Sequence, residues 1–193
     1  YGSAAQLKSN ALLESRKLQF KESSDIDSDF ITQKTIALSQ KANGSGLKEI
    51  YESIDQRLDA NPFYDERPQL KKEVKQKYQQ FGSVATANRL LLTQPALLKK
   101  QLADGVYNVL ESKDIIELSQ KADVAIKDQK FQTLTNTISL VGIGDIPPSA
   151  LKDITTQTLN GKFAGDENLQ NIYNSLSSSD KREFRTFVAK KAR

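Results

Sequence analysis

The chain has 193 residues, a formal net charge of +4, and no His, Cys, Met or Trp. The missing Cys and His exclude disulfides, thiolate nucleophiles, the Ser-His-Asp triad and the common structural zinc sites. Hydrophobic residues make up 37% of the chain, which is low for a compact globular protein and suits helices with one apolar stripe and broad polar faces.

Helical periodicity dominates the N-terminal third of the chain. Two helices are predicted over residues 4–21 and 28–42, separated by an irregular stretch at 22–27. The next helix has five apolar residues on one face, at Leu47, Ile50, Tyr51, Ile54 and Leu58. Ser45 is predicted to cap this helix, and Asn61-Pro62 to end it, because proline disfavours the helical conformation in the residue before it.

A longer helix is predicted to begin at Pro68, since proline suits the first helical turn. Its apolar stripe has a heptad-like spacing, is expected to pack inside a bundle, and consists of Leu70, Val74, Tyr78, Phe81, Ala85, Asn88 and Leu92. At Thr93-Gln94-Pro95 the chain either starts a new helix, with Thr93 as its N-cap, or kinks the old one. Gly105 is a natural stop for the helix that follows.

The C-terminal half is also predicted to be helical, over residues 113–127, 129–141, 149–160, 167–177 and 180–191, with Asp166 and Ser179 as N-caps of the last two. The octet Ile36–Asn43 returns as Ile116–Asp123, with six of eight residues identical. This similarity indicates either a duplicated three-helix unit or two helices that use the same common residues.

These elements predict an all-α fold, an elongated helical bundle of about seven to nine helices. The chain is expected to form a single helical unit over residues 1–193, with two packed sub-bundles of residues 1–92 and 93–193 as the alternative.

Two motifs resemble ligand-binding loops. Gly142–Pro148 begins like a dinucleotide loop but lacks the third glycine and a preceding strand, so a rigid inter-helix loop is predicted. Asp25, Asp27 and Asp29 alternate as at the start of an EF-hand loop, but the required Gly and Glu are missing. We expect these acids to lie at the N-terminus of a helix that begins near Ser28, with weak surface calcium binding as the alternative.

Acidic residues are the remaining candidates for catalysis, in the segments Glu111–Glu117 and Asp59–Glu66, which contain acids that could form a catalytic pair. A glycosidase needs two carboxylates about 5–9 Å apart. Such an enzyme also uses an aromatic platform for the sugar, and the chain has no Trp. The composition therefore favours a protein that is not an enzyme and uses no cofactor or metal.

Two segments are predicted to contact a partner. The loop Asn61–Arg67 combines two aromatic residues with alternating charges, although Phe63 could instead hold this loop against the bundle. The segment Lys181–Arg193 carries a net charge of +5 and the rest of the chain −1. Its helix is expected to dock through Phe184, Phe187 and Val188 and to present basic residues to an acidic partner or anionic surface. The candidate contact residues are Phe63, Tyr64, Asp65, Glu66, Arg67, Arg182, Arg185, Lys190 and Lys191.

The segment Leu118–Ala122, followed by Ala125, Ile126 and Phe131, resembles in composition and helix style the PsbQ-type extrinsic helical-bundle subunits of the thylakoid lumen. This resemblance implies an extrinsic lumenal subunit of a photosynthetic complex. The residues themselves predict a non-catalytic scaffold or docking subunit of a larger protein assembly. A carboxylate-based hydrolase and a weak binder of anionic polymers are two competing hypotheses.

The expected partners are protein subunits of a larger complex. No stretch approaches the roughly 20 apolar residues of a membrane-spanning helix. Any association with a membrane is therefore expected to be peripheral. Nucleic acid is disfavoured because the chain carries no motif of the known nucleic-acid-binding modules. The lack of Cys favours an extracytoplasmic or organelle-lumen location over the cytoplasm. A start at Tyr1 instead of Met indicates a processed form or part of a longer chain.

Overall fold

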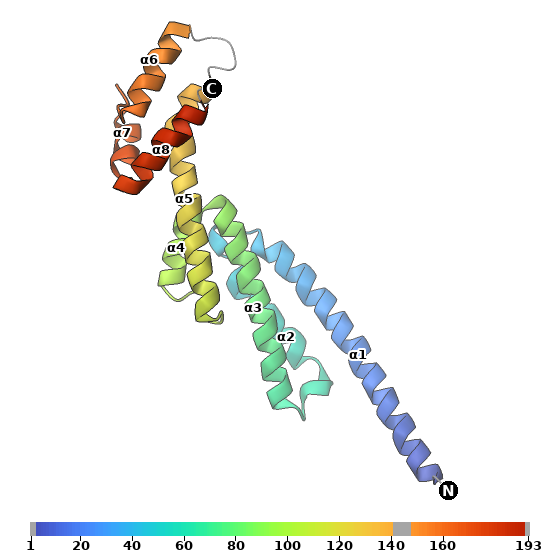
Figure 1. Ribbon diagram of the computed structural model, residues 1–193. Coiled ribbons are helices and arrows are strands. Elements are labelled where there is room, and N and C mark those ends of the chain that lie inside the picture. The colour runs from blue at the N-terminus through green and yellow to red at the C-terminus, as the bar shows by residue number, and fades with distance from the viewer. Residues whose placement is uncertain (1–2, 141–147, 192–193) are drawn as a thin grey trace. The chain divides into compact units, whose positions relative to one another are not determined.

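The computed structural model describes residues 3–140 and 148–191, and over these ranges the protein is all-α with eight α-helices and no strand (Figure 1). The predicted fold class is therefore confirmed. The chain forms two compact units, residues 1–120 and 121–193. The boundary lies inside one helix, α5 (Ser112–Leu140), whereas the alternative drawn from the sequence placed it between residues 92 and 93.

Unit 1 contains four complete helices and the start of α5. The four helices are α1 (Ala4–Ser39), α2 (Leu47–Asp59), α3 (Pro68–Thr93) and α4 (Pro95–Ala103), with short 3-10 turns at Ala42–Gly44 and Pro62–Tyr64. The first three helices pack against one another, and α3 also contacts α4. They form the scaffold on which the loop at residues 61–67 is held.

The α1 helix is continuous, so the prediction of two helices separated at residues 22–27 is wrong. No Gly or Pro interrupts this region, and the polar side chains of Ser23 and Asp27 bond to Asn61. These tertiary contacts offset the low helix propensity of Ser and Asp. The helix ends before Asn43 and Gly44, which take positive φ angles of 60° and 67° that a helix cannot contain.

The predicted apolar stripe of α2 is confirmed. Leu47, Ile50, Ile54 and Leu58 are buried and Tyr51 is half-buried. The core of unit 1 joins this stripe to α1 and to the 61–67 loop through Ile31, Leu38, Ile50, Ile54, Leu58 and Tyr64. The helical period of the sequence alone therefore identifies the face of α2 that carries the core.

The predicted stripe of α3 is right for its first half and wrong for its second. Leu70, Val74 and Tyr78 pack against the core, but Phe81 and Leu92 are 43% and 78% exposed. The buried positions in the second half are mostly small, namely Gly82, Ser83, Thr86, Ala87 and Leu90. A Cβ on Gly82 would lie 2.7 Å from Cγ2 of Ile50, so α3 comes close to α2 through its small residues.

The helix start at Pro68 and the cap at Asp166 are as predicted, and of the two alternatives left open at Thr93-Gln94-Pro95 a new helix is observed, but the caps named at Ser45, Thr93 and Ser179 are wrong. Pro68 and Pro95 open α3 and α4, and Asp166 Oδ1 accepts from the backbone amide of Leu169 at 3.0 Å. The N-caps of α2 and α4 are Gly46 and Gln94 instead of Ser45 and Thr93, and neither makes a side-chain capping bond. At α8, Ser177 accepts from the Asp180 amide, so Ser179 is not the cap.

Unit 2 contains the second part of α5, together with α6 (Pro148–Leu159), α7 (Glu167–Asn174) and α8 (Ser178–Lys191). Its buried core consists of Phe131, Leu134, Leu176, Phe184 and Val188. The predicted glycine-containing loop at Gly142–Pro148 lies, apart from Pro148, outside the described residues. None of the helices in the described part is long and apolar enough to cross a membrane.

The two similar octets have different structures. Ile36–Asn43 covers the end of α1, whereas Ile116–Asp123 lies inside α5, which replaces the two helices predicted over 113–127 and 129–141. Gly44 follows the first octet and Val124 follows the second. Only the first octet is therefore followed by a residue that readily takes the left-handed conformation that ends a helix.

Ile54→Ala should lower the free energy of unfolding by about 2–5 kcal/mol, because Ile54 is fully buried and its truncation leaves a cavity. Urea denaturation measures the loss. The control is Leu92→Ala at a 78% exposed site, which should change stability little. Equal effects of the two substitutions would contradict the core described above.

Tyr107 ties the connection between α4 and α5 to the end of α1. It is 1% exposed, and its hydroxyl donates to Oε1 of Gln101 at 2.8 Å. The amide of Gln101 donates in turn to the carbonyl of Asn43 at 3.1 Å. Burial, and to a smaller extent the charge of Tyr51, raise the pKa of Tyr107 to about 12.

Alkaline pH should therefore destabilise the protein through Tyr107. The folded state holds the Tyr107 proton more tightly than the unfolded chain does, so the contribution is complete below pH 10 and is lost between pH 10 and about 12. It amounts to about 2–3 kcal/mol. Denaturation of Tyr107→Phe over the same pH range should show a correspondingly smaller decline, and identical declines would refute the assignment.

Candidate functional site

A groove lies between α1 and the 61–67 loop of unit 1, with a volume of about 430 Å³. We call it the α1–loop groove. It combines aromatic surface, a charged rim and polar groups from both segments, and its lining residues are Arg16, Gln19, Phe20, Ser23, Asn61, Pro62, Phe63, Glu66 and Arg67. The groove is thus built from one helix and one loop that are far apart in sequence.

Aromatic stacking forms the apolar part of the groove. The rings of Phe20 and Phe63 are stacked, with centroids 3.9 Å apart, and Tyr64 meets Phe63 edge-on at 5.5 Å. The guanidinium of Arg67 lies 4.1 Å from the centre of the Phe63 ring, and its Nη1 donates to the Phe63 carbonyl at 2.8 Å. Phe63 is therefore held by another ring and by a cation.

A buried polar network fixes the start of the loop. Asp27 is only 5% exposed, and its Oδ1 accepts from Nε of Arg57 at 2.6 Å. The Asn61 amide nitrogen donates to Oδ2 of Asp27 and to Oγ of Ser23, both at 2.8 Å, and its Oδ1 accepts from the Phe63 amide at 3.1 Å. Both oxygens of the buried carboxylate thus have partners, and α1, α2 and the loop are joined at one point.

The predicted contact residues of the loop differ in how far they are buried. Phe63 is half-buried against Phe20, which agrees with the alternative that it holds the loop to the bundle. Tyr64 is 3% exposed and belongs to the core, so it offers no surface to a partner. Asp65, Glu66 and Arg67 are exposed, and the last two border the groove.

The α1 side of this groove, which includes Arg16 and Phe20, was not predicted, because the break expected at residues 22–27 separated the helix over 4–21 from the part of α1 that packs against the core. A signal was present in the sequence. Phe20, Asp27, Ile31 and Leu38 follow helical spacing through the supposed break and lie on the face toward the core.

The second predicted site lies on α8 in unit 2. Phe184 and Val188 are buried and Phe187 is half-buried, so the predicted docking face of this helix is confirmed. Nζ of Lys127 on α5 pairs with Oε2 of Glu183 at 2.7 Å, and this hydrogen bond raises the pKa of Lys127. The pair anchors α8 to α5 at the surface.

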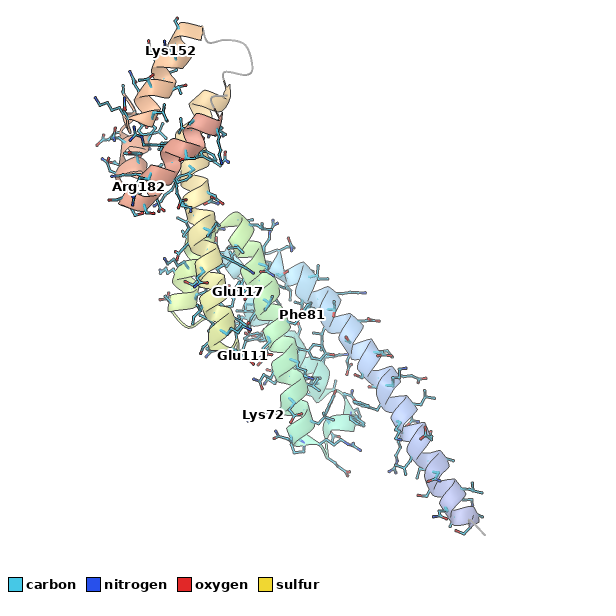
Figure 2. All side chains as sticks on the ribbon, in the orientation of Figure 1. Lys72, Phe81, Glu111, Glu117, Lys152 and Arg182 are labelled. Atoms are coloured by element: carbon cyan, nitrogen blue, oxygen red, sulfur yellow. The ribbon has the colours of Figure 1, made fainter. Side chains whose placement is uncertain are left out.

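The basic residues of α8 differ in what they contact. Nζ of Lys191 donates to Oε1 of Gln132 at 3.0 Å and to Oγ1 of Thr135 at 3.2 Å, so it is bound within unit 2. Arg182, Arg185 and Lys190 are exposed, and Figure 2 shows Arg182 near the start of the helix. Lys190 also borders a groove of about 350 Å³ between α5 and α8. These three side chains form the basic surface of α8.

Of the acids considered for catalysis, Asp114 is half-buried and the others are exposed. Glu111 and Glu117 lie near the start of α5 (Figure 2), Asp59 pairs with Lys71, and Glu66 borders the α1–loop groove. In the described ranges no group of three acidic, His or Cys side chains could hold a metal ion.

The Asp25, Asp27 and Asp29 series lies within α1, so the helix start expected near Ser28 is wrong. Asp25 and Asp29 are exposed, whereas Asp27 turns toward the core and binds Arg57 and Asn61. Helical spacing therefore turns Asp27 to a different side of α1 from Asp25 and Asp29, although the three residues look like a single acidic motif in the sequence.

No family model matches the chain, and neither a curated protein nor a solved structure is significantly similar to it. The resemblance to PsbQ-type bundles accordingly stays a prediction from helix style.

Asn61→Ala should lower the free energy of unfolding by about 1–3 kcal/mol. The substitution removes three hydrogen bonds and leaves Oδ2 of buried Asp27 without the Asn61 side-chain amide that donates to it. Backbone amides of residues 61–67 should also exchange hydrogen faster. Asn88→Ala, at an exposed site on α3, is the control. Unchanged exchange in the Asn61 variant would show that the network does not hold the loop.

Proposed function

We propose that this protein is a non-catalytic docking subunit of a larger protein assembly, which binds partner chains through the α1–loop groove and the basic surface of α8. The observation that carries the proposal is the fixed loop. The Asp27, Arg57 and Asn61 contacts hold residues 61–67 in place without a partner, so binding need not order them. Such preorganisation lowers the entropic cost of association.

The chemistry of the groove favours a protein segment as its occupant. Phe20 and Phe63 offer aromatic surface of the kind that accepts an apolar anchor at an interface. Arg16 and Arg67 border the same space and would hydrogen-bond a carboxylate beside that anchor. Glu66 adds a negative charge to the same groove. It would repel an acidic segment unless that segment also carries a basic residue that pairs with Glu66.

The basic surface of α8 supports a second contact. Arg182, Arg185 and Lys190 are exposed on a helix whose other side is anchored in the core of unit 2. A cluster of this kind attracts an acidic surface and speeds its association. We therefore expect the assembly to present acidic residues to α8.

Charge reversal tests this function. In chemical cross-linking of the tagged protein in extract of its source cells, Arg16→Glu/Arg67→Glu and Arg182→Glu/Arg185→Glu should each reduce the yield of adducts with partner proteins about tenfold or more, equivalent to about 1.4 kcal/mol of binding energy. Lys72→Glu/Lys77→Glu makes the same charge change at exposed positions of α3 and should behave as wild type (Figure 2 shows Lys72).

Circular dichroism would first establish that all three double variants fold. The proposal fails if the wild type forms no adducts, or if adduct yields are the same for both site variants and for the control.

A further inference from the structure

The turn between α1 and α2 contains an exposed Asn-Gly dipeptide. Asn43 is exposed, Gly44 follows it, and the two residues take positive φ angles of 60° and 67°. In the described part of the chain the side-chain amide of Asn43 has no hydrogen-bond partner. Glycine has no Cβ, so the side chain of the residue before it can approach its backbone nitrogen closely. The Asn43 side chain and the Gly44 nitrogen are therefore a pair of groups that can react with each other.

The reaction that this dipeptide permits is deamidation through a five-membered ring. The Gly44 nitrogen loses its proton to solvent and bonds to the amide carbon Cγ of Asn43, and the side-chain nitrogen leaves as ammonia. Water then opens the resulting succinimide at one of its two carbonyl carbons. Opening at Cγ gives an aspartate, and opening at the backbone carbonyl gives an isoaspartate, whose main chain runs through Cβ and Cγ. Water is consumed and ammonia is released, so the reaction needs no oxidant and no cofactor.

A hydrogen bond from Gln101 opposes this reaction in the folded chain. The ψ angle of Asn43 is 18°, which turns the Gly44 nitrogen away from the Asn43 side chain. The planar Asn43–Gly44 peptide must therefore rotate as a unit before the ring can close. The carbonyl of this peptide accepts from Nε2 of Gln101 at 3.1 Å, and the Tyr107 hydroxyl fixes Gln101 by donating to its Oε1 at 2.8 Å. Ring closure thus requires the Gln101 hydrogen bond to break.

A second Asn-Gly pair, at Asn160 and Gly161, is held by more contacts. The amide nitrogen of Gly161 donates to the Thr158 carbonyl at 3.0 Å, and the Gly161 carbonyl accepts from Nε2 of Gln170 at 3.0 Å. Gly161 also lies so close to Tyr173 that an added Cβ would be 2.3 Å from the ring. The same dipeptide is therefore present twice in one molecule, and the second copy serves as an internal reference for the first.

We propose that Asn43 is a site of spontaneous deamidation, at a rate that the Gln101 hydrogen bond limits. The reaction adds a negative charge, and isoaspartate also adds a methylene group to the backbone of a three-residue turn. A Cβ on Gly44 would lie 3.2 Å from side-chain atoms of Leu90 and Thr86, so α3 leaves this turn little room for a longer backbone. Modification should therefore loosen the junction of α1 with α2 and α3. This site does not depend on the proposed docking function, and the purified chain alone tests it.

Incubation of the purified chain in mildly alkaline buffer, followed by peptide mapping with mass spectrometry, measures both pairs at once. The exchange of NH2 for OH identifies deamidation, and labelling by isoaspartyl methyltransferase identifies isoaspartate. Asn43 should react about fivefold faster than Asn160 or more, because ring closure at Asn160 breaks more hydrogen bonds. In urea the two pairs should react at similar rates, since their dipeptides are the same. A rate at Asn160 that equals or exceeds the rate at Asn43 in the folded chain would overturn the proposal.

Gln101→Glu tests the hydrogen bond itself. The new side chain keeps an oxygen for Tyr107 but has no N–H to donate to Asn43, so deamidation at Asn43 should become about two- to tenfold faster. Gln76→Glu makes the same exchange at an exposed position of α3 and should leave the rate unchanged. Global unfolding would accelerate Asn160 as well. An unchanged rate at Asn43 in Gln101→Glu, or an equal acceleration at Asn160, contradicts the role proposed for Gln101.

Discussion

The buried carboxylate of Asp27 determines how unit 1 is arranged around its candidate site. A charge removed from water is tolerated only when its oxygens are hydrogen-bonded, and Arg57 and Asn61 supply those bonds from the end of α2 and the start of the loop. The contact requires α1, α2 and the loop to meet at one point. Phe63 is then in position to stack on Phe20, and the α1–loop groove forms between them.

Features set by local chemistry could be predicted from the sequence. The buried face of α2, the helix start at Pro68 and the cap at Asp166 depend on residues within a turn or two. The continuity of α1 could not be predicted in this way. Residues 22–27 are rich in Ser and Asp, which favour helix ends, and the partners that keep them helical lie 30 or more residues away.

The groove and the packing of α3 also could not be predicted, because they too depend on contacts between residues far apart in sequence. The pattern of large apolar residues pointed to Phe81 and Leu92, but close approach to α2 selects small residues such as Gly82 for the buried side. In the loop, the sequence marked two adjacent aromatics without showing that Tyr64 enters the core while Phe63 borders the groove. Both outcomes depend on which neighbour is close, and a single sequence does not contain that information.

The α5 helix passes from one compact unit into the other without a break. Their boundary lies within its continuous hydrogen-bonded backbone, where domains are more often joined by an irregular linker. A helix propagates cooperatively once it is nucleated, so order in α5 on one side of the boundary favours order on the other. A protease has no exposed linker to cut at this point. Cleavage between the units would break a helix that carries buried residues of both, such as Leu118 in unit 1 and Phe131 in unit 2.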